Sequence, residues 1–192
     1  MARECRRDLC RVTRVGPPLL VVLAGRPGTG KTTLGRLLAG RLPAAYLRTD
    51  VIVGPMLRRG LTEDEEAAAH VGYDIACEVA MENLRAEVPV LVDGVHATHE
   101  RRALWRDVAE ATNARLVQVE TTLSDEDEHR RRVDKRQAPG VGYLGPTWEQ
   151  VQAMRYDPWS KGTDGPRLLV ETSDINAALA VSIAHVTSTS SA

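Results

Sequence analysis

Five short apolar runs recur along the chain, and longer segments with helically spaced apolar residues separate them. The runs predict strands over residues 19–24, 44–48, 88–92, 116–120 and 168–170. The other segments predict a helix that carries Leu34, Leu37, Leu38 and Leu42, and helices over about 62–85, 98–111, 124–136, 147–156 and 175–185. Strands that alternate with helices form a parallel sheet with right-handed crossovers, so the pattern predicts an α/β fold.

Local signals mark where these elements begin and where the chain turns. Residues 62–65 predict a capping box, and N-caps are predicted at Ser124, Thr147 and Asp174. Residues 51–60 are predicted to be irregular because Gly54-Pro55 is a typical breaker. The Pro/Gly-rich residues 138–146 predict a second irregular loop.

The loop after the first predicted strand carries the most specific motif. Residues 25–32 fit G-x-x-x-x-G-K-[ST] without a gap, and a strand and a helix flank them, as a phosphate-binding loop (P-loop) requires. Glycines in this loop allow a tight turn whose N–H groups converge on an anion. Lys31 is placed for the β- and γ-phosphates, and the Thr32 hydroxyl for Mg²⁺. The predicted ATP-binding residues are Gly25, Gly28, Thr29, Gly30, Lys31, Thr32 and Thr33.

Two aspartates follow later strands, at the sheet edge where ligands of such folds bind. Asp93 ends the third strand, and we predict that it holds Mg²⁺ together with Thr32. Asp50 ends the second strand, and we predict that it acts as a general base. The alternative for Asp50 is a polar strand end or a helix cap.

Two other classes of P-loop protein fit the sequence less well. Ring ATPases usually carry a glutamate directly after the strand-end aspartate, whereas Gly94 follows Asp93. A GTPase needs N-K-x-D to read guanine, and residues 161–164 have the wrong spacing.

The order of features resembles the small P-loop kinases, in the AAA-type group of polynucleotide 5′-kinases, zeta-toxin-like kinases and chloramphenicol phosphotransferase. The resemblance is carried by G-x-P-G-T-G-K-T-T at 25–33, by Asp50, by Asp93 with residues 96–98, and by Arg132-x-x-x-Arg136. It implies a three-layer P-loop NTPase fold with a five-stranded parallel sheet in the order 2-3-1-4-5, helices on both faces and a short arginine-bearing lid.

The resemblance also implies catalytic roles. Asp50 would accept the proton of the attacking hydroxyl, Asp93 would assist magnesium or the acceptor, and Arg132 and Arg136 would cover the transferring phosphoryl group. Many relatives carry an arginine three residues after the base, and here that position is Val53. This departure weakens any transfer of substrate identity.

Several of these features have alternative explanations. Arg132 and Arg136 share one helix face, which could instead be solvated and paired with Glu126 or Glu128. His96 and His99 could contact the acceptor or be ordinary loop residues. Three aromatic residues could line an acceptor site or pack in the core: Trp148, Tyr156 and Trp159.

The composition narrows the classes of partner and compartment but identifies no reaction. The net charge of -1 over 192 residues does not suggest a nucleic-acid or membrane partner. Cys5, Cys10 and Cys77 lack metal or redox spacing, which favours reduced thiols and a cytoplasmic protein. We expect one domain over 16–187, after a disordered basic leader (1–15) and before a flexible tail (188–192).

We therefore expect an ATP- and Mg²⁺-dependent kinase that phosphorylates a hydroxyl of a small molecule, such as a sugar, nucleoside or antibiotic. One alternative is a polynucleotide 5′-hydroxyl kinase, for which Arg58-Arg59 and Arg101-Arg102 could form a local patch. The alternative from another class is a regulatory module that binds ATP without transfer.

Overall fold

The computed structural model describes residues 16–137 and 145–188. Five strands form one parallel sheet in the order β2-β3-β1-β4-β5, which confirms the predicted topology. The strands are β1 (Leu19–Ala24), β2 (Ala45–Arg48), β3 (Val90–Asp93), β4 (Arg115–Thr122) and β5 (Leu168–Glu171). The helices are α1 (Lys31–Ala39), α2 (Thr49–Arg58), α3 (Glu65–Arg85), α4 (His99–Ala111), α5 (Glu126–Arg136), α6 (Trp148–Ala153), α7 (Lys161–Asp164) and α8 (Ile175–Ser188).

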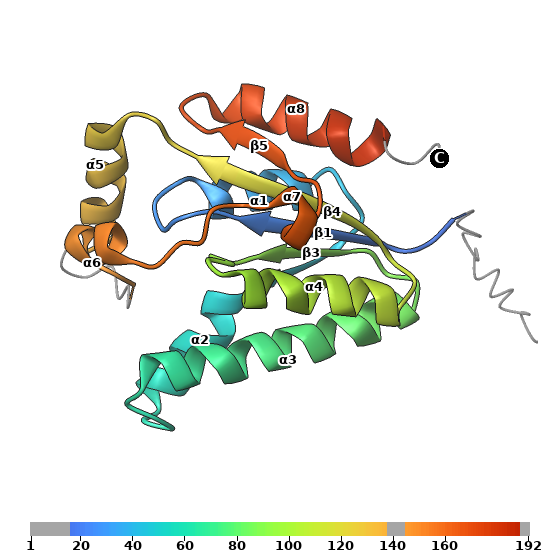
Figure 1. The fold of residues 1–192 in the computed structure, drawn as a ribbon, viewed down its shortest axis with the longest axis horizontal. Coiled ribbons are helices and arrows are strands. Elements are labelled where there is room, and N and C mark those ends of the chain that lie inside the picture. The colour runs from blue at the N-terminus through green and yellow to red at the C-terminus, as the bar shows by residue number, and fades with distance from the viewer. Residues whose placement is uncertain (1–15, 138–144, 189–192) are drawn as a thin grey trace, which may run out of the picture.

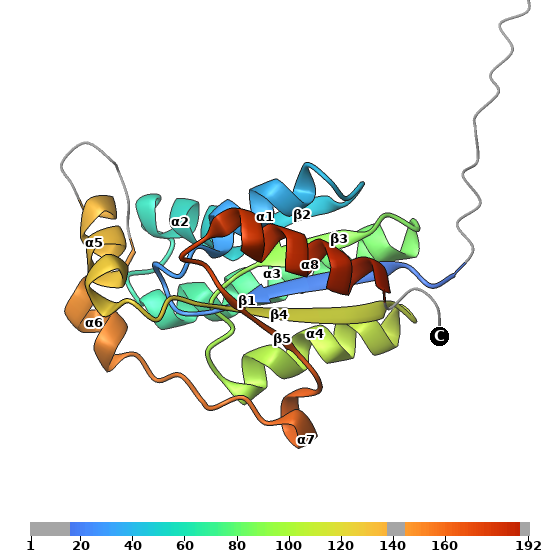
Figure 2. The same ribbon diagram turned by 90° about the horizontal axis from the view of Figure 1, so that it is seen from above.

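Strand β1 lies at the centre of the sheet and is buried on both faces. Leu20 and Val22 belong to a core cluster with residues of α3 and α4, whereas Val21 and Leu23 belong to a cluster with residues of α1 and α8. Because side chains alternate along a strand, one unbroken apolar run serves both cores. Figures 1 and 2 show the resulting three layers, with α3 and α4 on one face of the sheet and α1 and α8 on the other.

All five strands run in the same direction, so their carboxyl ends meet at one edge of the sheet. The loop between β1 and α1, the start of α2 and the end of β3 lie at this edge. Figure 1 shows α5 and α6 beyond it. The fold therefore brings together the segments in which the sequence predicts function.

The prediction of an irregular segment over residues 51–60 is wrong, because α2 is a helix with Pro55 inside it. A proline in a helix removes one backbone hydrogen bond and costs about 3 kcal/mol in isolation. Packing of α2 against α3 offsets that cost: a Cβ atom added to Gly72 would lie only 2.4 Å from Cγ2 of Val53. A tertiary contact thus overrides the local breaker signal.

In two helices the N-cap is not the residue predicted from the sequence but an aspartate that lies nearer to the first turn. Asp64, not Thr62, caps α3 and accepts hydrogen bonds from the N–H groups of Glu66 and Ala67. Asp125, not Ser124, caps α5. The Ser124 hydroxyl instead donates a hydrogen bond to Oε2 of Glu171, at the end of β5, with the two oxygen atoms 2.5 Å apart.

The remaining helix boundaries follow the sequence more closely. Thr147 forms the predicted cap of α6, as part of a capping box, and Asp174 accepts from two N–H groups at the start of α8. Helix α6 ends at Ala153 rather than near residue 156, and α7 has no counterpart in the prediction. Met154, after α6, has φ -59° and ψ 126°, which ends the helix, and the Ser160 side chain caps α7 by accepting from the N–H of Thr163.

Some predictions fall outside the described residues. These are the leader (1–15), residues 138–144 of the predicted loop, and residues 189–192 of the predicted tail. Cys5 and Cys10 are in the leader, and Cys77 is buried with a free thiol.

The contact between Gly72 and Val53 makes a testable prediction about stability. Gly72→Ala should lower the free energy of unfolding by roughly 1–3 kcal/mol, because the added methyl group overpacks the α2–α3 contact. Urea denaturation measures the effect. The matched control is Gly162→Ala, whose added Cβ would meet its nearest atom at 3.9 Å. Equal stability of the two variants would contradict this account of how α2 is held.

Candidate active site

The P-loop turns sharply between β1 and α1, and its glycines are required by that turn. Gly28 and Gly30 have φ angles of 90° and 86°, a region that side chains rarely adopt. A Cβ atom on Gly28 would also lie 2.7 Å from Val133 of α5. The two glycines, with Lys31 and Thr32, line one side of a cavity of about 450 Å³.

Lys31, the first residue of α1, is buried beneath this loop. Its amine donates a hydrogen bond to the backbone oxygen of Arg26 at 2.9 Å. Burial lowers the pKa of Lys31 from 10.5 to about 8, although the nearby carboxylates of Asp93 and Asp50 act in the opposite direction. Within residues 16–137 and 145–188 no carboxylate forms a close ion pair with Lys31, so the buried amine is a cation whose charge is only partly offset.

The other predicted loop residues have different positions. The Thr29 hydroxyl contacts the Arg26 oxygen at 2.8 Å and the Thr121 hydroxyl at 2.7 Å, so it braces the loop against β4. Gly25 also packs against Thr121, at a φ of 140°. Thr33 is exposed on α1. These three residues shape or flank the loop, whereas Gly28, Gly30, Lys31 and Thr32 line the cavity.

Asp93, at the end of β3, is a buried carboxylate with two hydrogen-bond donors and one ion-pair partner. Its Oδ2 accepts hydrogen bonds from the Thr32 hydroxyl and the Tyr46 hydroxyl, both at 2.8 Å, and lies 3.3 Å from Nε of Arg48. Burial and the neighbouring carboxylate raise the pKa of Tyr46. Thr32 and Asp93 are therefore side by side, and both offer the hard oxygen atoms that Mg²⁺ prefers.

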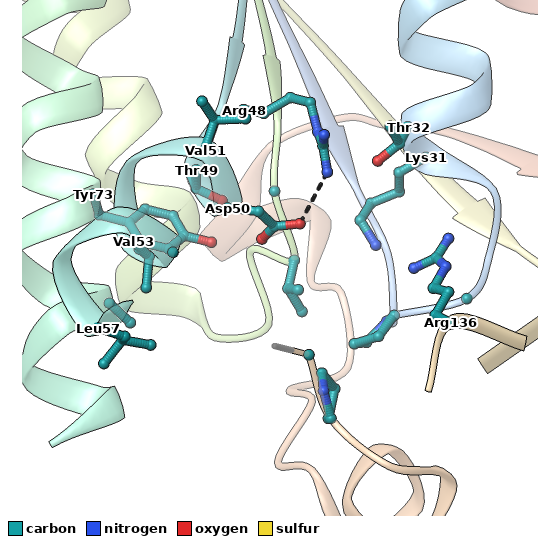
Figure 3. Close-up of a pocket in the computed structure, with 18 of the residues that line it drawn as sticks. Lys31, Thr32, Arg48, Thr49, Asp50, Val51, Val53, Leu57, Tyr73 and Arg136 are labelled. Carbon is teal, nitrogen blue, oxygen red and sulfur yellow. Dashed lines mark hydrogen bonds and ion pairs between the residues drawn. The ribbon is translucent and has the colours of Figure 1, made fainter. Parts of the chain in front are cut away.

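Asp50 lies in the first turn of α2, on the opposite side of the cavity from Lys31 (Figure 3). Its side chain is 61% exposed and pairs with Nη2 of Arg48 at 3.3 Å. Figure 3 shows Thr32, Lys31 and Arg136 facing Asp50 and Arg48 across the cavity. A carboxylate and several cations thus converge on one space.

The two predicted lid arginines are not equivalent. Arg136 lines the cavity, and its charge helps to lower the pKa of Lys31. Arg132 lies outside the cavity lining: its Nε donates to Glu128 at 2.7 Å, and its terminal nitrogens lie 3.4 Å from the backbone oxygen of Thr172. The structure brings Arg136, but not Arg132, together with Lys31 and Asp50.

Arg26 connects the P-loop to α6. Its Nη1 donates to the backbone oxygens of Val151 and Met154 at 2.7 and 3.2 Å. The backbone oxygen of the same residue accepts from Lys31. One loop residue therefore fixes both the lysine and the end of a helix.

The two histidines lie behind the cavity rather than in it. His96 is fully buried, and its Nδ1 accepts from Nε1 of Trp105 at 3.0 Å. Burial lowers the pKa of His96 to about 3, so the ring stays neutral. His99 pairs through Nδ1 with the buried carboxylate of Asp164 at 2.9 Å.

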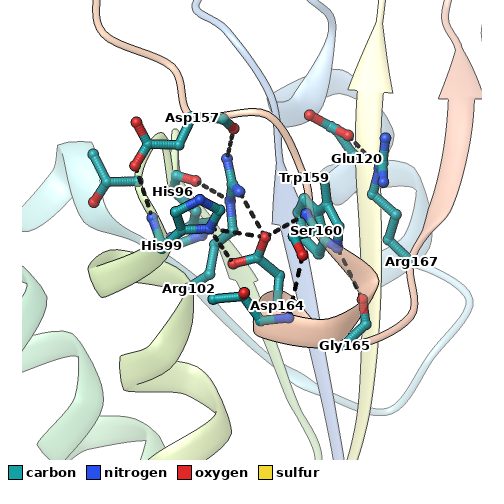
Figure 4. A network of polar contacts seen from close by, with 12 residues as sticks. His96, His99, Arg102, Glu120, Asp157, Trp159, Ser160, Asp164, Gly165 and Arg167 are labelled. Atoms are coloured by element: carbon teal, nitrogen blue, oxygen red, sulfur yellow. Dashed lines mark hydrogen bonds and ion pairs between the residues drawn. The ribbon is translucent and has the colours of Figure 1, made fainter.

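Asp164 is the centre of the network in Figure 4. It pairs with Arg102 at 3.1 Å, and Arg102 donates to the backbone oxygens of His96, Ala97 and Asp157. The Arg102 guanidinium also lies 4.7 Å from the Trp159 ring centroid. Arg102 is thus a buried structural residue and no part of a surface patch.

The three aromatic residues are engaged in packing. Trp159 donates from Nε1 to the backbone oxygen of Gly165 at 2.9 Å, and the Tyr156 hydroxyl donates to Glu120 at 2.8 Å. Trp148 is buried with Val133 and Val151. None of the three is among the described residues that line the cavity.

Residues 20–157 match the sequence model of a family described as an AAA domain. The match covers well over half of the chain. The chain belongs to this AAA domain family.

Two curated relatives resemble part of this AAA domain. A UPF0200 protein of Pyrobaculum aerophilum is 31% identical over 88 residues, which are 44% of this chain and 51% of that protein. A shikimate kinase of Paracidovorax citrulli is 37% identical over 78 residues, which are 38% of this chain and 41% of that enzyme. The similarity thus spans about half, or less, of the length of these relatives.

Solved structures share the fold over most of its length. A candidate kinase from Chloroflexus aurantiacus superposes with a TM-score of 0.72 at 22% identity, over 88% of this chain and 99% of that one. A sugar kinase from Janibacter gives a TM-score of 0.65 at 16% identity, over 88% and 95%. The AAA domain therefore has the fold of small P-loop kinases, as the sequence resemblance implies.

Within the described residues, no helix combines the length and the apolar character needed to cross a membrane.

Two residues of the AAA domain that contact Asp93 are not among those predicted from the sequence. Tyr46 and Arg48 are separated by one residue on β2, so their side chains point to the same face of the strand. Polar groups at alternate positions near a strand end, beside the P-loop, are a signal that could have found them. The apolar wall from α2 was also missed, because the segment was predicted to be irregular.

The buried amine of Lys31 predicts how the stability of the ligand-free domain depends on pH. The folded pKa lies below the unfolded one, so the charged amine destabilises the fold below pH 8, and this penalty disappears as the pH rises to 10.5. Lys31→Met should therefore be more stable than the wild type at pH 7, by on the order of 1–3 kcal/mol. Denaturation of the variant and the wild type at pH 7 and pH 10 measures the difference in stability and its dependence on pH.

The difference between Lys31→Met and the wild type should shrink at pH 10. The Arg26 oxygen keeps the Thr29 hydroxyl as a donor in the variant, so no backbone group is left unbonded. A less stable variant with a pH-independent difference would contradict this account of Lys31.

Proposed function

We propose that the protein is an ATP-dependent phosphotransferase that moves the γ-phosphoryl group of ATP to a hydroxyl of a small-molecule acceptor. One observation carries this proposal: Asp50 faces Lys31, Thr32 and Arg136 across a single cavity. Phosphoryl transfer needs alignment and positive charge more than covalent chemistry from the protein. Similarity to a shikimate kinase and to the fold of a sugar kinase supports a small acceptor.

Each residue has a role in this proposal. The P-loop amides and Lys31 bind the phosphates, and Arg136 offsets the charge that spreads over the transferring group. Asp50 orients the acceptor hydroxyl and takes its proton as the new P–O bond forms and the bond to the leaving ADP breaks. Arg48, which pairs with both Asp50 and Asp93, holds the base in place. Arg132 reaches the phosphoryl group only if it leaves Glu128.

The residues present fit a magnesium ion. Thr32 and Asp93 would hold it, the carboxylate directly or through water, and phosphate oxygens would complete the shell. Mg²⁺ would neutralise charge on the phosphates. Within the described part of the chain no cluster of three or more His, Cys, Asp or Glu side chains forms a separate metal site.

Two other functions remain to be tested against this one. A polynucleotide 5′-kinase would use Arg58 and Arg101, which line the cavity, and its oligonucleotide affinity would fall steeply with salt. A non-catalytic ATP-binding module would release no ADP in response to any acceptor. A panel of hydroxyl metabolites and 5′-hydroxyl oligonucleotides, assayed for ADP release at two salt concentrations, separates the three functions.

The free thiol of Cys77 is consistent with a cytoplasmic protein.

Asp50→Asn tests the general base. The substitution keeps the shape of the side chain but removes its charge, so acceptor phosphorylation should fall by roughly 10²–10⁴-fold. Affinity for ATP and Mg²⁺, measured by calorimetry, should stay near that of the wild type. Asp107→Asn is the matched control, because Asp107 is exposed on α4 and does not line the cavity. Loss of ATP binding in Asp50→Asn would instead assign Asp50 to the metal site.

Arg136→Ala and Arg132→Ala test the lid. Removal of Arg136 should lower kcat by about 10²-fold or more with little change in the KM for ATP, because the contact strengthens in the transition state. Arg132→Ala should have the smaller effect, since Arg132 pairs with Glu128 outside the cavity. If both variants keep the wild-type kcat, α5 provides no catalytic cation.

A further inference from the structure

The half of the cavity away from the P-loop contains more positive charge than the proposed reaction uses. Three arginines line it: Arg48, Arg58 and Arg101. Arg48 is paired with Asp50 and Asp93, both at 3.3 Å. Among residues 16–137 and 145–188, no carboxylate forms an ion pair with Arg58 or Arg101.

Arg58 lies at the cavity wall, over a glycine of its own helix. Its Nη1 would lie 3.0 Å from a Cβ atom on Gly54, one turn earlier on α2. Gly54 also lines the cavity. Because Gly54 has no side chain, the guanidinium can approach the helix closely while it lines the cavity.

Arg101 is held by an aromatic ring. Its guanidinium carbon lies 5.1 Å from the centroid of the Tyr73 ring. That ring is buried, and its hydroxyl accepts the N–H of His96 at 3.0 Å, so it cannot turn freely. A cation–π contact orients a guanidinium without neutralising its charge.

An apolar surface lies beside these two cations. Val53 and Leu57 of α2 and Ala69 of α3 line the same half of the cavity, and Figure 3 shows Val53, Leu57 and Tyr73 together there. A ligand that fits this half therefore combines an apolar body with an anionic group. A guanidinium is well suited to the planar, two-point binding of a carboxylate or phosphate.

We propose that the acceptor is an anionic hydroxy compound, whose carboxylate, sulfate or phosphate group is held by Arg58 and Arg101 while its hydroxyl lies at Asp50. The inference rests on the proposed kinase function and adds the class of substrate to it. The two arginines would act in recognition rather than in transfer, so they should affect KM for the acceptor and leave kcat nearly unchanged.

The neighbour of Arg58 provides a matched control. Arg59 is also exposed at the end of α2, but it does not line the cavity. If the charge of Arg58 served only to solvate the helix end, the two variants Arg58→Ala and Arg59→Ala would behave alike.

The first experiment compares anionic acceptors with neutral partners of the same skeleton. The pairs are gluconate and glucose, shikimate and its methyl ester, glycerol 3-phosphate and glycerol, and adenosine 5′-phosphosulfate and adenosine. ADP release should be faster with an anionic member, and the pair that responds identifies the anion. Hydrogen bonds to charged groups contribute about 1.5–3 kcal/mol, so Arg58→Ala and Arg101→Ala should raise the KM for that acceptor by roughly 10–100-fold.

The same variants should leave kcat and the KM for ATP within about twofold of the wild type, and Arg59→Ala should change neither. If Arg101→Ala is unstable, Arg101→Gln replaces it in the experiment, because glutamine keeps the aliphatic part of the side chain over Tyr73. Equal use of anionic and neutral members would overturn the inference, and so would equal KM values in Arg58→Ala and Arg59→Ala.

A binding experiment separates failure of this inference from failure of the kinase proposal. Calorimetry measures binding of the same four anions to the wild-type protein saturated with Mg²⁺ and a non-hydrolysable ATP analogue. One outcome is that no acceptor stimulates ADP release, yet an anion binds to the wild type and to Arg59→Ala but not to Arg58→Ala. That outcome would support the anion site and contradict the kinase proposal. If none of the four anions binds to the wild type, the anion site is overturned.

Discussion

The buried carboxylate of Asp93 joins the two sides of the site. It is only 3% exposed, and a charge removed from water to this degree needs several close partners. Thr32 from α1, together with Tyr46 and Arg48 from β2, supplies them. Because Arg48 also pairs with Asp50, the carboxylate at the end of β3 indirectly sets the position of the carboxylate at the start of α2. The nucleotide side and the acceptor side are therefore parts of one polar network.

A second buried ion pair, Arg102–Asp164, supports the site from behind. Arg102 binds three backbone oxygens in addition to the carboxylate, and two of them belong to the loop between β3 and α4. That loop contributes Gly94 and Val95 to the cavity lining. Arg102 and Asp164 are 1% and 0% exposed, so removing either partner would leave a buried charge unpaired.

The strands and the P-loop could be predicted from the sequence because their signals are local, whereas the sheet order was implied only by the resemblance to small P-loop kinases. Apolar runs of strand length and a motif within eight residues do not depend on distant contacts. Helix α2 could not be predicted from local signals. Gly54-Pro55 indicates a break, but contact with α3, which lies further along the chain, stabilises the helix. Local propensity predicts such a segment correctly only where tertiary packing is weak.

Side-chain roles were harder to predict than elements. The spacing of Arg132 and Arg136 places both on one helix face, yet Glu128 lies one turn before Arg132 and binds it. In the same way Arg101 and Arg102 are neighbours in sequence, but successive residues of a helix point about 100° apart. One therefore reaches the cavity and the other the core. Charge alone in a sequence does not distinguish these cases.

The division of the cavity between two stretches of chain has an evolutionary consequence. Its phosphate side comes mainly from the P-loop, the start of α1 and the end of α5, whereas most of the opposite wall comes from residues 48–73, a continuous segment from the end of β2 to the middle of α3. Mutations in that segment can alter the shape and charge of the opposite wall without touching a residue that cradles phosphate. Exchange of this one stretch between homologues is therefore a practical way to change which acceptor the cavity prefers.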